Sequence, residues 1–239
     1  MTKVMDMATT INKQKTFNHL FSALAKHTKG ELPARPVLEQ FIYAVLREGS
    51  TREHADRAFQ AIQTRFFDWN EVRVSAAEEI ADVVAGMVPE PSQRAQRIID
   101  FLQEVFETTF SFDLEPLHKK GLKQAAKQLA RYQAANDYAV AWVTQQSLGG
   151  HAIPLDNVAV RVLKRLQLVD DAESNLEAVR TGVEHQVPKA KGAVFVELVS
   201  ALGKTHCHET GPACPSCPVK PHCPTGQTAK APAASKKPR

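Results

Sequence analysis

The sequence predicts a fold that is almost entirely α-helical. Apolar residues recur at intervals of three and four, which is the spacing of one face of a helix. The clearest run consists of Leu38, Phe41, Ile42 and Val45. Alternating β-branched residues, the usual sign of a half-buried strand, form no convincing run. Gly and Pro fall between the periodic segments, so we expect helices joined by short connections.

The individual elements follow from this period and its interruptions. After a polar, frayed segment 1–15, helices are expected over residues 17–26, 38–45, 58–62, 95–106, 157–168 and 192–202. The breaks between them carry helix-terminating residues, at Pro33, Pro36, Gly49, Pro91, Gly149 and Pro154. The tail 225–239 is rich in Ala, Pro, Ser and Lys and is expected to be disordered.

Length and composition restrict the class of protein. The chain has 239 residues, of which 43% are hydrophobic, enough for one large or two small domains. No apolar stretch is long enough to span a bilayer, and no secretory segment is visible, so we expect a cytoplasmic protein without a membrane partner. The tail holds four of the 30 basic residues and no acid, which leaves 26 of each sign elsewhere. Nucleic-acid binding would therefore require a local basic patch.

All four cysteines lie close together near the C-terminus, with the spacing C-x6-C-x2-C-x5-C: Cys207, Cys214, Cys217 and Cys223. In an intracellular chain this clustering favours a metal site over a disulfide framework. Thiolates suit zinc or an iron–sulfur cluster. Zinc ribbons usually carry two C-x2-C pairs, whereas only Cys214 and Cys217 form one here, so we favour the cluster. Structural zinc is the alternative, with His206, His208 and His222 as spare ligands.

The cysteine spacing and the segment 195–207 before it resemble the 4Fe-4S loop of endonuclease III and related helix-hairpin-helix DNA glycosylases. Further upstream, Ile153-Pro154-Leu155-Asp156 followed by a helix with Arg165-Leu166 resembles the segment that carries the catalytic aspartate of that family. The likeness covers residues 37–224. It implies a 4Fe-4S cofactor held by the four cysteines and a catalytic role for Asp156.

The resemblance also implies a domain organisation and an activity. A six-helix lobe, 37–150, would contain the hairpin, and a second lobe would join the N-terminal segment 1–36 to the cluster segment 151–224. Tyr138 would face Asp156 across the cleft. The implied activity is base-excision repair by a monomer on double-stranded DNA with a damaged or mismatched base. Relatives that also cleave the strand carry a lysine where this chain has Tyr138, so monofunctional hydrolysis is expected.

Several positions depart from the family pattern. Both hairpin glycines are replaced, by Ala134 and Asn136, which puts phosphate binding by the hairpin in question. Val45 stands where adenine-excising relatives place a glutamate, which argues against adenine excision. The loop 208–213 carries no Lys or Arg. These losses favour a second hypothesis, a catalytically inactive 4Fe-4S DNA-binding relative; a third is a zinc-stabilised helical interaction module.

Each candidate residue also has a simpler interpretation. Asp156 precedes a helix and is suited to cap it, a role compatible with catalysis. Tyr138 is of a type that often packs half-buried. The candidates for DNA contact are Lys119, Lys123, Lys127, Arg131, Asn136, Arg161 and Lys164. The first four recur every four residues and would form a basic stripe on a helix, which is more often simply solvated.

Overall fold

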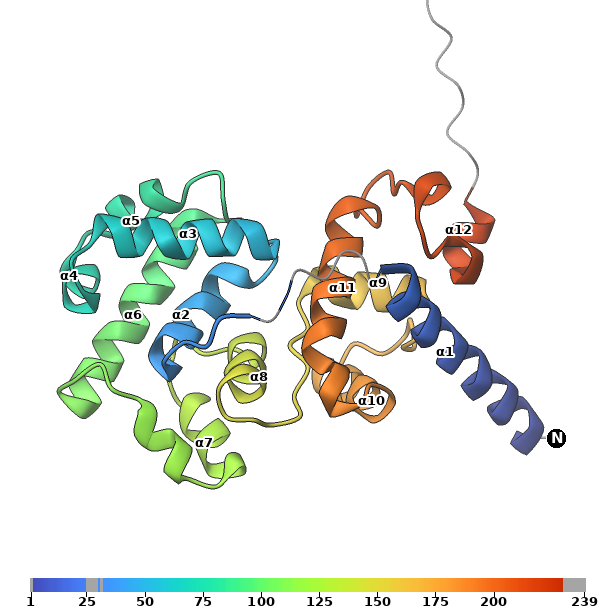
Figure 1. The fold of residues 1–239 in the computed structure, drawn as a ribbon, viewed down its shortest axis with the longest axis horizontal. Coiled ribbons are helices and arrows are strands. Elements are labelled where there is room, and N and C mark those ends of the chain that lie inside the picture. The colour runs from blue at the N-terminus through green and yellow to red at the C-terminus, as the bar shows by residue number, and fades with distance from the viewer. Residues whose placement is uncertain (1, 25–29, 31, 230–239) are drawn as a thin grey trace, which may run out of the picture.

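The computed structural model describes residues 2–24, 30 and 32–229, with the side chains of the first helix from Lys13 onward. The described part of the chain is helical and contains no β-strand, as the periodicity predicted. Two lobes lie side by side, with the chain crossing between them twice (Figure 1). None of the described helices is both long and apolar enough to cross a bilayer.

The first lobe is built around one fully buried helix. Within residues 37–150, all of which are described, there are seven α-helices: α2 (Val37–Arg47), α3 (Arg52–Arg65), α4 (Trp69–Val74), α5 (Ala77–Val84), α6 (Pro91–Thr109), α7 (Leu122–Leu129) and α8 (Asp137–Gln146). Every residue of α2 except Glu39 is buried, against α3, α6 and α8. The prediction counted six helices; the extended residues at Ser75 and Ala76 separate α4 from α5.

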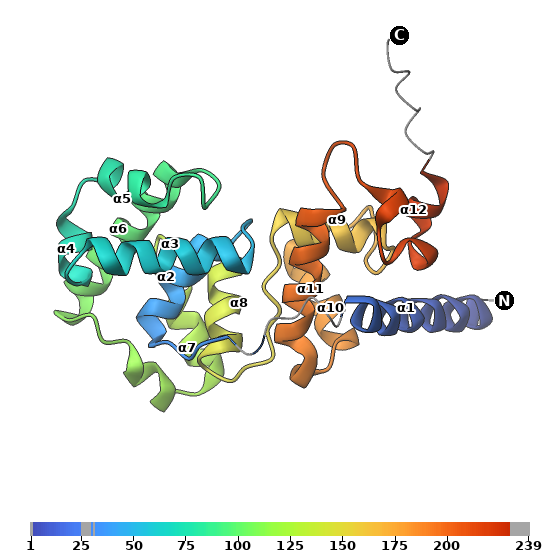
Figure 2. The ribbon, with the colours of Figure 1, turned by 45° about the horizontal axis from the view of Figure 1, so that its top comes forward.

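The second lobe joins the two ends of the chain. It contains α1 (Thr2–Leu24), α9 (Asn157–Arg165), α10 (Leu176–Gln186), α11 (Gly192–Thr205) and α12 (Pro224–Thr228). Phe17 of α1 packs on Phe195 of α11, with ring centroids 5.7 Å apart. Figure 2 shows α1 extending away from the lobe beyond this contact. Short 3-10 helices of this lobe occupy Lys189–Lys191, Cys214–Ser216 and Lys220–His222. Another, Glu115–Lys119, lies in the first lobe.

Two predicted boundaries in this lobe are wrong. The first helix begins at Thr2 rather than at residue 17, since the polar segment before it contains no Gly or Pro to interrupt a helix. The tail was expected to be disordered from residue 225, but Pro224–Thr228 form α12. Its first turn has a proline, and the Gly226 N–H donates to Cys223 Sγ, which caps the helix. Residues 230–239 lie outside the described part.

Tight helix packing holds the second lobe together. Helices α9 and α11 pass so closely at Gly203 that a Cβ there would lie 2.3 Å from Val158 Cγ1. Arg161 of α9 donates from Nη2 to the Gly203 carbonyl at 3.5 Å. The close approach explains why a residue without a side chain stands in the last turns of α11.

A buried arginine joins the two lobes. Arg47, at the end of α2, has a side chain only 1% exposed. It donates to Ser200 Oγ at 3.0 Å and to Glu197 Oε1 at 3.1 Å, both on α11, and also to the Ser50 carbonyl. A buried guanidinium needs such partners, because an unpaired charge in the interior is costly.

Arg47→Met is expected to lower the free energy of unfolding by about 3–5 kcal/mol, because it leaves Glu197 without its partner at the lobe interface. Urea unfolding followed by circular dichroism measures this loss. The control is Arg65→Met, which removes an exposed ion pair to Glu79 and is expected to cost less than about 1 kcal/mol. Equal losses in the two variants would contradict the interpretation.

Candidate functional site

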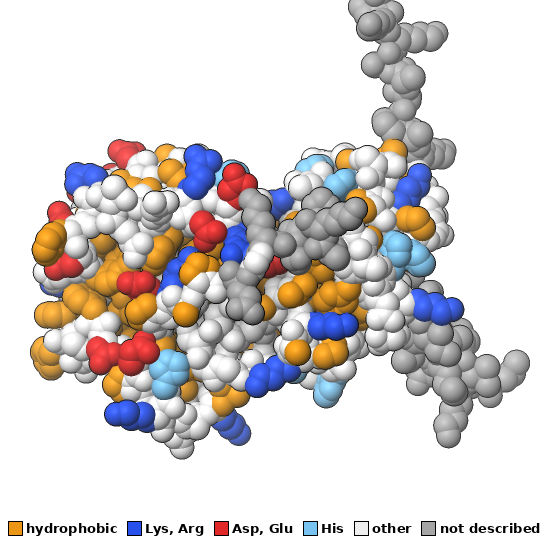
Figure 3. All heavy atoms as spheres, viewed as in Figure 1, with side chains coloured by type: hydrophobic (Ala, Val, Ile, Leu, Met, Phe, Trp, Pro, Cys, Tyr) orange, Lys and Arg blue, Asp and Glu red, His pale blue; other side chains and the backbone are white. Residues whose placement is uncertain are grey.

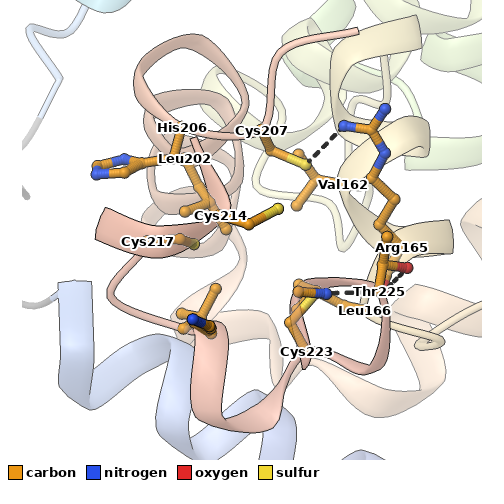
Figure 4. Close-up of a pocket in the computed structure, with 13 residues that line it drawn as sticks. Val162, Arg165, Leu166, Leu202, His206, Cys207, Cys214, Cys217, Cys223 and Thr225 are labelled. Atoms are coloured by element: carbon orange, nitrogen blue, oxygen red, sulfur yellow. Dashed lines mark hydrogen bonds between the residues drawn. The ribbon is translucent and has the colours of Figure 1, made fainter. Parts of the chain in front are cut away.

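The structure brings all four cysteines to one pocket. The chain leaves α11, loops around the pocket and returns through α12, and Cys207, Cys214, Cys217 and Cys223 all line it (Figure 4). Apolar side chains of α9, α11 and the loop complete the wall, among them Val162, Leu166, Leu202 and Val219. Cys223 is buried and the other three cysteines are partly exposed. Four thiols therefore share one largely apolar surrounding.

Arg165 of α9 holds this loop against the second lobe. Its guanidinium donates to Cys207 Sγ at 3.4 Å (Figure 4). It also donates to the carbonyls of His208 and Glu209. Its own carbonyl accepts from Thr225 Oγ1 at 3.0 Å. Donors aimed at cysteine sulfur stabilise the thiolate form that a metal centre requires.

The thiols themselves are partly desolvated. Burial raises the pKa of Cys217 and of Cys223, while backbone N–H donors oppose the shift. For Cys223 the Gly226 N–H is such a donor, with N and Sγ 3.3 Å apart. Buried thiols with orienting donors are typical of ligands to a soft metal centre.

The donor set bears on which metal centre fits. Among the described residues, no three His, Cys, Asp or Glu side chains converge tightly enough to hold a single ion. A lone zinc needs its ligands that close, at about 2.3 Å from one point for thiolates. A 4Fe-4S cluster takes four cysteine thiolates spread around its faces. Four cysteine thiols around one pocket are the donor type of a 4Fe-4S cluster.

Asp156 is fixed at the junction of the two lobes by two backbone groups. It caps α9, with Oδ1 accepting from the Ala159 N–H at 2.7 Å. Its Oδ2 accepts from the Gly49 N–H at 2.8 Å, across the junction. Gly49 follows α2 and has a φ of +68°, a conformation in which other residues are strained. The cap interpretation therefore holds, and the same carboxylate also reaches the opposite lobe.

Tyr138 lines the same small cavity as Asp156. The cavity lies between α8, the segment before α9, and α11, with Ile153, Phe195 and Ser200 also in its wall. Tyr138 is only 4% exposed, and burial raises its pKa well above the usual value, with the Arg47 charge opposing the shift. Its hydroxyl is thus neutral and offers a hydrogen bond rather than a nucleophile. The resemblance placed these two residues on opposite sides of one cleft, and here they share one cavity.

The hairpin between α7 and α8 keeps its place without its glycines. Neither Ala134 nor Asn136 has a positive φ; Asn136 is extended, at −133°, and caps α8 through the Ala139 N–H. Asn136 Nδ2 donates to both carboxylate oxygens of Glu48, at 2.9 and 3.0 Å. The Asn136 side chain is therefore fully used inside the protein.

The predicted basic stripe is not one helical face. Lys119 ends a 3-10 helix, Gly121 precedes α7, Lys123 and Lys127 lie on α7, and Arg131 follows its end. The prediction of a continuous helix across these positions was wrong, because the chain turns at Lys120 and Gly121. All four basic residues are exposed. In the view of Figure 3, basic side chains are scattered over both lobes rather than gathered in one patch.

Two other candidates for DNA contact are engaged within the protein. Arg161 Nε donates to the Cys207 carbonyl at 3.0 Å, and Lys164 Nζ donates to the Asp171 carbonyl at 2.8 Å. A phosphate contact by either side chain would compete with these bonds. Both residues lie on α9, where Arg161 contacts the cysteine loop and Lys164 contacts the segment that follows the helix.

The sequence analysis missed a polar group at the lobe junction. Ser200 of α11 lines the Tyr138–Asp156 cavity and accepts a hydrogen bond from Arg47, which also pairs with Glu197. The charges of Arg47, Glu48 and Glu197 all act on Tyr138. Half-buried Lys204 lies one turn beyond Ser200; burial lowers its pKa, and nearby Asp156 opposes the shift. Glu197, Ser200 and Lys204 are spaced by three and four residues, so they lie on one face of α11. This spacing was the sequence signal that could have indicated a polar face.

The fold described above is similar to that of solved structures of endonuclease III and of a thymine-DNA glycosylase. The chain superposes on endonuclease III in a non-covalent complex with DNA with a TM-score of 0.68 and 20% identity, covering 90% of this chain and 96% of that one. A thermostable thymine-DNA glycosylase gives 0.66 and 18%, covering 92% and 99%. At these identities the likeness concerns the fold.

A sequence relative comes from a plant. DEMETER-like protein 2 of Arabidopsis thaliana is 26% identical in an alignment of 193 positions, which covers 73% of this chain and 14% of that protein. The chain therefore corresponds to a small part of that relative. No family model matches the sequence.

Proposed function

We propose that this protein is a DNA base-excision glycosylase that hydrolyses the N-glycosidic bond of a damaged or mismatched base in double-stranded DNA. The observation that carries the proposal is the Asp156 carboxylate, which Gly49 and Ala159 hold at the junction of two lobes beside Tyr138. The fold supports it, since similar structures include a thymine-DNA glycosylase and endonuclease III bound to DNA.

The chemistry follows from this placement. The target nucleotide must leave the stack to bring its sugar to the Asp156 carboxylate. As its bond to the sugar breaks, positive charge develops on the sugar, and a fixed carboxylate stabilises that charge and orients the attacking water. Tyr138 has no amine, so no Schiff base forms at this position and the reaction ends at base release. The proposed enzyme is therefore monofunctional; that it acts as a monomer is a separate part of the proposal.

The four cysteines would hold a 4Fe-4S cluster. When bound, the cluster supplies four thiolate bonds and a redox-capable centre to a loop that has little core of its own. Arg165 and the Gly226 N–H orient two of the sulfurs. In the proposed enzyme, residues 1–36 and 151–224 belong to one lobe and residues 37–150 to the other. The exposed basic side chains of the first lobe contact DNA phosphates: Lys119, Lys123, Lys127 and Arg131.

The test is base release by anaerobically purified protein. Duplexes carrying oxidised pyrimidines, mismatched thymine or an abasic site are incubated with the protein, and iron and zinc contents are measured on the same sample. Base release by protein that contains iron is the expected result. The Asn136–Glu48 contact, which occupies the hairpin, favours a second candidate: an inactive DNA-binding relative, which would bind these duplexes without releasing a base.

Tyr138→Lys is expected to create strand cleavage at abasic sites and an adduct that borohydride traps, neither of which the parent protein shows. Burial at this position, beside the Arg47 charge, would lower the pKa of the new amine and leave it reactive. The matched control is Val140→Lys, on the same helix but lining a different pocket. Circular dichroism verifies that each variant folds. Trapping by the parent, or equal trapping by Val140→Lys, would contradict the assignment of position 138.

A further inference from the structure

Glu48 is the residue immediately before the turn that reaches Asp156. It ends α2, and the next residue, Gly49, donates its N–H to Asp156 Oδ2 at 2.8 Å. The orientation of that N–H depends on the peptide between the two residues. Whatever holds Glu48 therefore also controls the donor that orients Asp156.

The Glu48 carboxylate is held by donors from two further elements. Arg97 Nη1 of α6 lies 2.7 Å from Oε2, and Arg94 Nη1 lies 3.3 Å from the same oxygen. The Asn136 amide, from the hairpin, donates to both oxygens. The Glu48 side chain is 21% exposed, so these charges interact with little screening by water.

The hairpin contacts Arg97 and Glu48 through Ala134 and Asn136, the two residues that stand where the family pattern has glycine. The Ala134 carbonyl accepts from Arg97 Nε at 2.6 Å, and Asn136 binds Glu48 directly. The hairpin thus contacts the same arginine–carboxylate pair twice. Its side-chain and backbone polar groups are turned toward α2 and α6.

Arg94, which pairs with the Glu48 carboxylate, also holds the backbone of the turn. Arg94, 8% exposed, donates from Nη2 to the Glu48 carbonyl at 2.9 Å and from Nη1 to the Val45 carbonyl. Arg47 donates to the Ser50 carbonyl. Two buried arginines therefore bond the carbonyls of the residues on either side of Gly49. These bonds restrict the direction in which the Gly49 N–H points.

We infer that Glu48 is a positioning residue for Asp156, and that the hairpin serves this reaction by fixing Glu48 through Asn136 and Ala134. The inference rests on the proposed function for its catalytic consequence, but its structural content is independent of activity. The hairpin binds the Glu48 carboxylate, and this contact keeps the Gly49 N–H fixed toward the Asp156 carboxylate.

The test compares Glu48→Gln with Glu48→Asp and with Glu104→Gln. Glu104 is the matched control because its Oε2 accepts from the Gln133 N–H at 2.8 Å, so it holds the same hairpin from the side away from Gly49. Three quantities are measured: amide hydrogen exchange at Gly49 by NMR, the single-turnover rate of base release, and the Kd for an abasic-site duplex. Asp156→Ala, which removes both acceptor oxygens, provides the reference for a lost Gly49 bond.

Glu48→Gln is expected to speed exchange at Gly49 and to lower the base-release rate about 10- to 100-fold, with the Kd changed less than about two-fold. Glu48→Asp, which keeps the charge, should lie between Gln and the parent, and Glu104→Gln should leave rate and exchange unchanged. Unchanged exchange in Glu48→Gln, an effect on Kd alone, or an equal effect of Glu104→Gln would overturn the inference. If the parent releases no base, the proposed function fails, while the exchange measurement still decides the role of Glu48.

Discussion

Asp156→Asn is expected to lower the rate of base release by at least about 100-fold while the protein stays folded and still binds DNA. The substitution removes the negative charge that faces the developing charge on the sugar. It also replaces one acceptor oxygen with an NH2 group, so either the Gly49 or the Ala159 N–H loses its partner. Asparagine still caps helices well, so the loss of stability should be small, below about 1 kcal/mol. Single-turnover kinetics and thermal unfolding separate the two effects.

The matched control for this variant is Asp68→Asn. Asp68 caps α4 in the same way, accepting from the Glu71 N–H at 2.8 Å, but lies on the first lobe away from the cavity. Its substitution should leave base release unchanged. If Asp156→Asn retained the parent rate, Asp156 would be a helix cap and lobe contact only, and the catalytic proposal would fall.

Cys223→Ser is expected to abolish the visible absorbance of the protein and most of its iron, from about four atoms per chain. Cys223 is the buried cysteine, and its thiol contacts both α12, through the Gly226 N–H, and the Arg165 carbonyl of α9. Loss of this ligand should therefore release the loop and α12 from α9, whereas the first lobe, with its own core, keeps its helices. Iron and sulfide analysis, visible absorbance and limited proteolysis measure these changes.

His206→Ala distinguishes the two candidate metal centres. His206 lines the same pocket as the cysteines and would be available to a zinc ion. With a four-cysteine cluster, His206→Ala keeps its colour and iron content. A colourless parent that binds one zinc, and loses it in His206→Ala, would exclude the cluster and support the zinc-stabilised module.

The sequence by itself determined the features that depend on neighbouring residues. The helical period of α2 and α6 reports which faces are buried, and both helices are found where the period placed them. The four cysteines span so short a segment that any compact loop brings them near one another, so their spacing was sufficient to predict a shared pocket. An aspartate before a helix caps it through bonds to residues three positions away, which is why the Asp156 cap was also predictable.

Predictions from local sequence were wrong where a tertiary contact or one helix-breaking residue determined where a helix begins or ends. The interval of four between Lys119 and Arg131 indicated one helix, but Gly121 lies between a 3-10 helix and α7. The apolar period marked the start of the first helix too late, because the segment before residue 17 has no clear apolar period. The start of α12 depends on a bond to Cys223 that composition does not report.

Only the tertiary structure revealed the polar group around Asp156. Gly49 and Asp156 are 107 residues apart, Glu48 and Asn136 are 88 apart, and Arg47 and Glu197 are 150 apart. Helical periodicity shows which face of a helix is buried but not which distant residue it meets. The hydrogen bonds that hold the Asp156 carboxylate form only when packing has brought α2, the hairpin and α11 together, and that packing depends on the whole apolar core rather than on any local segment.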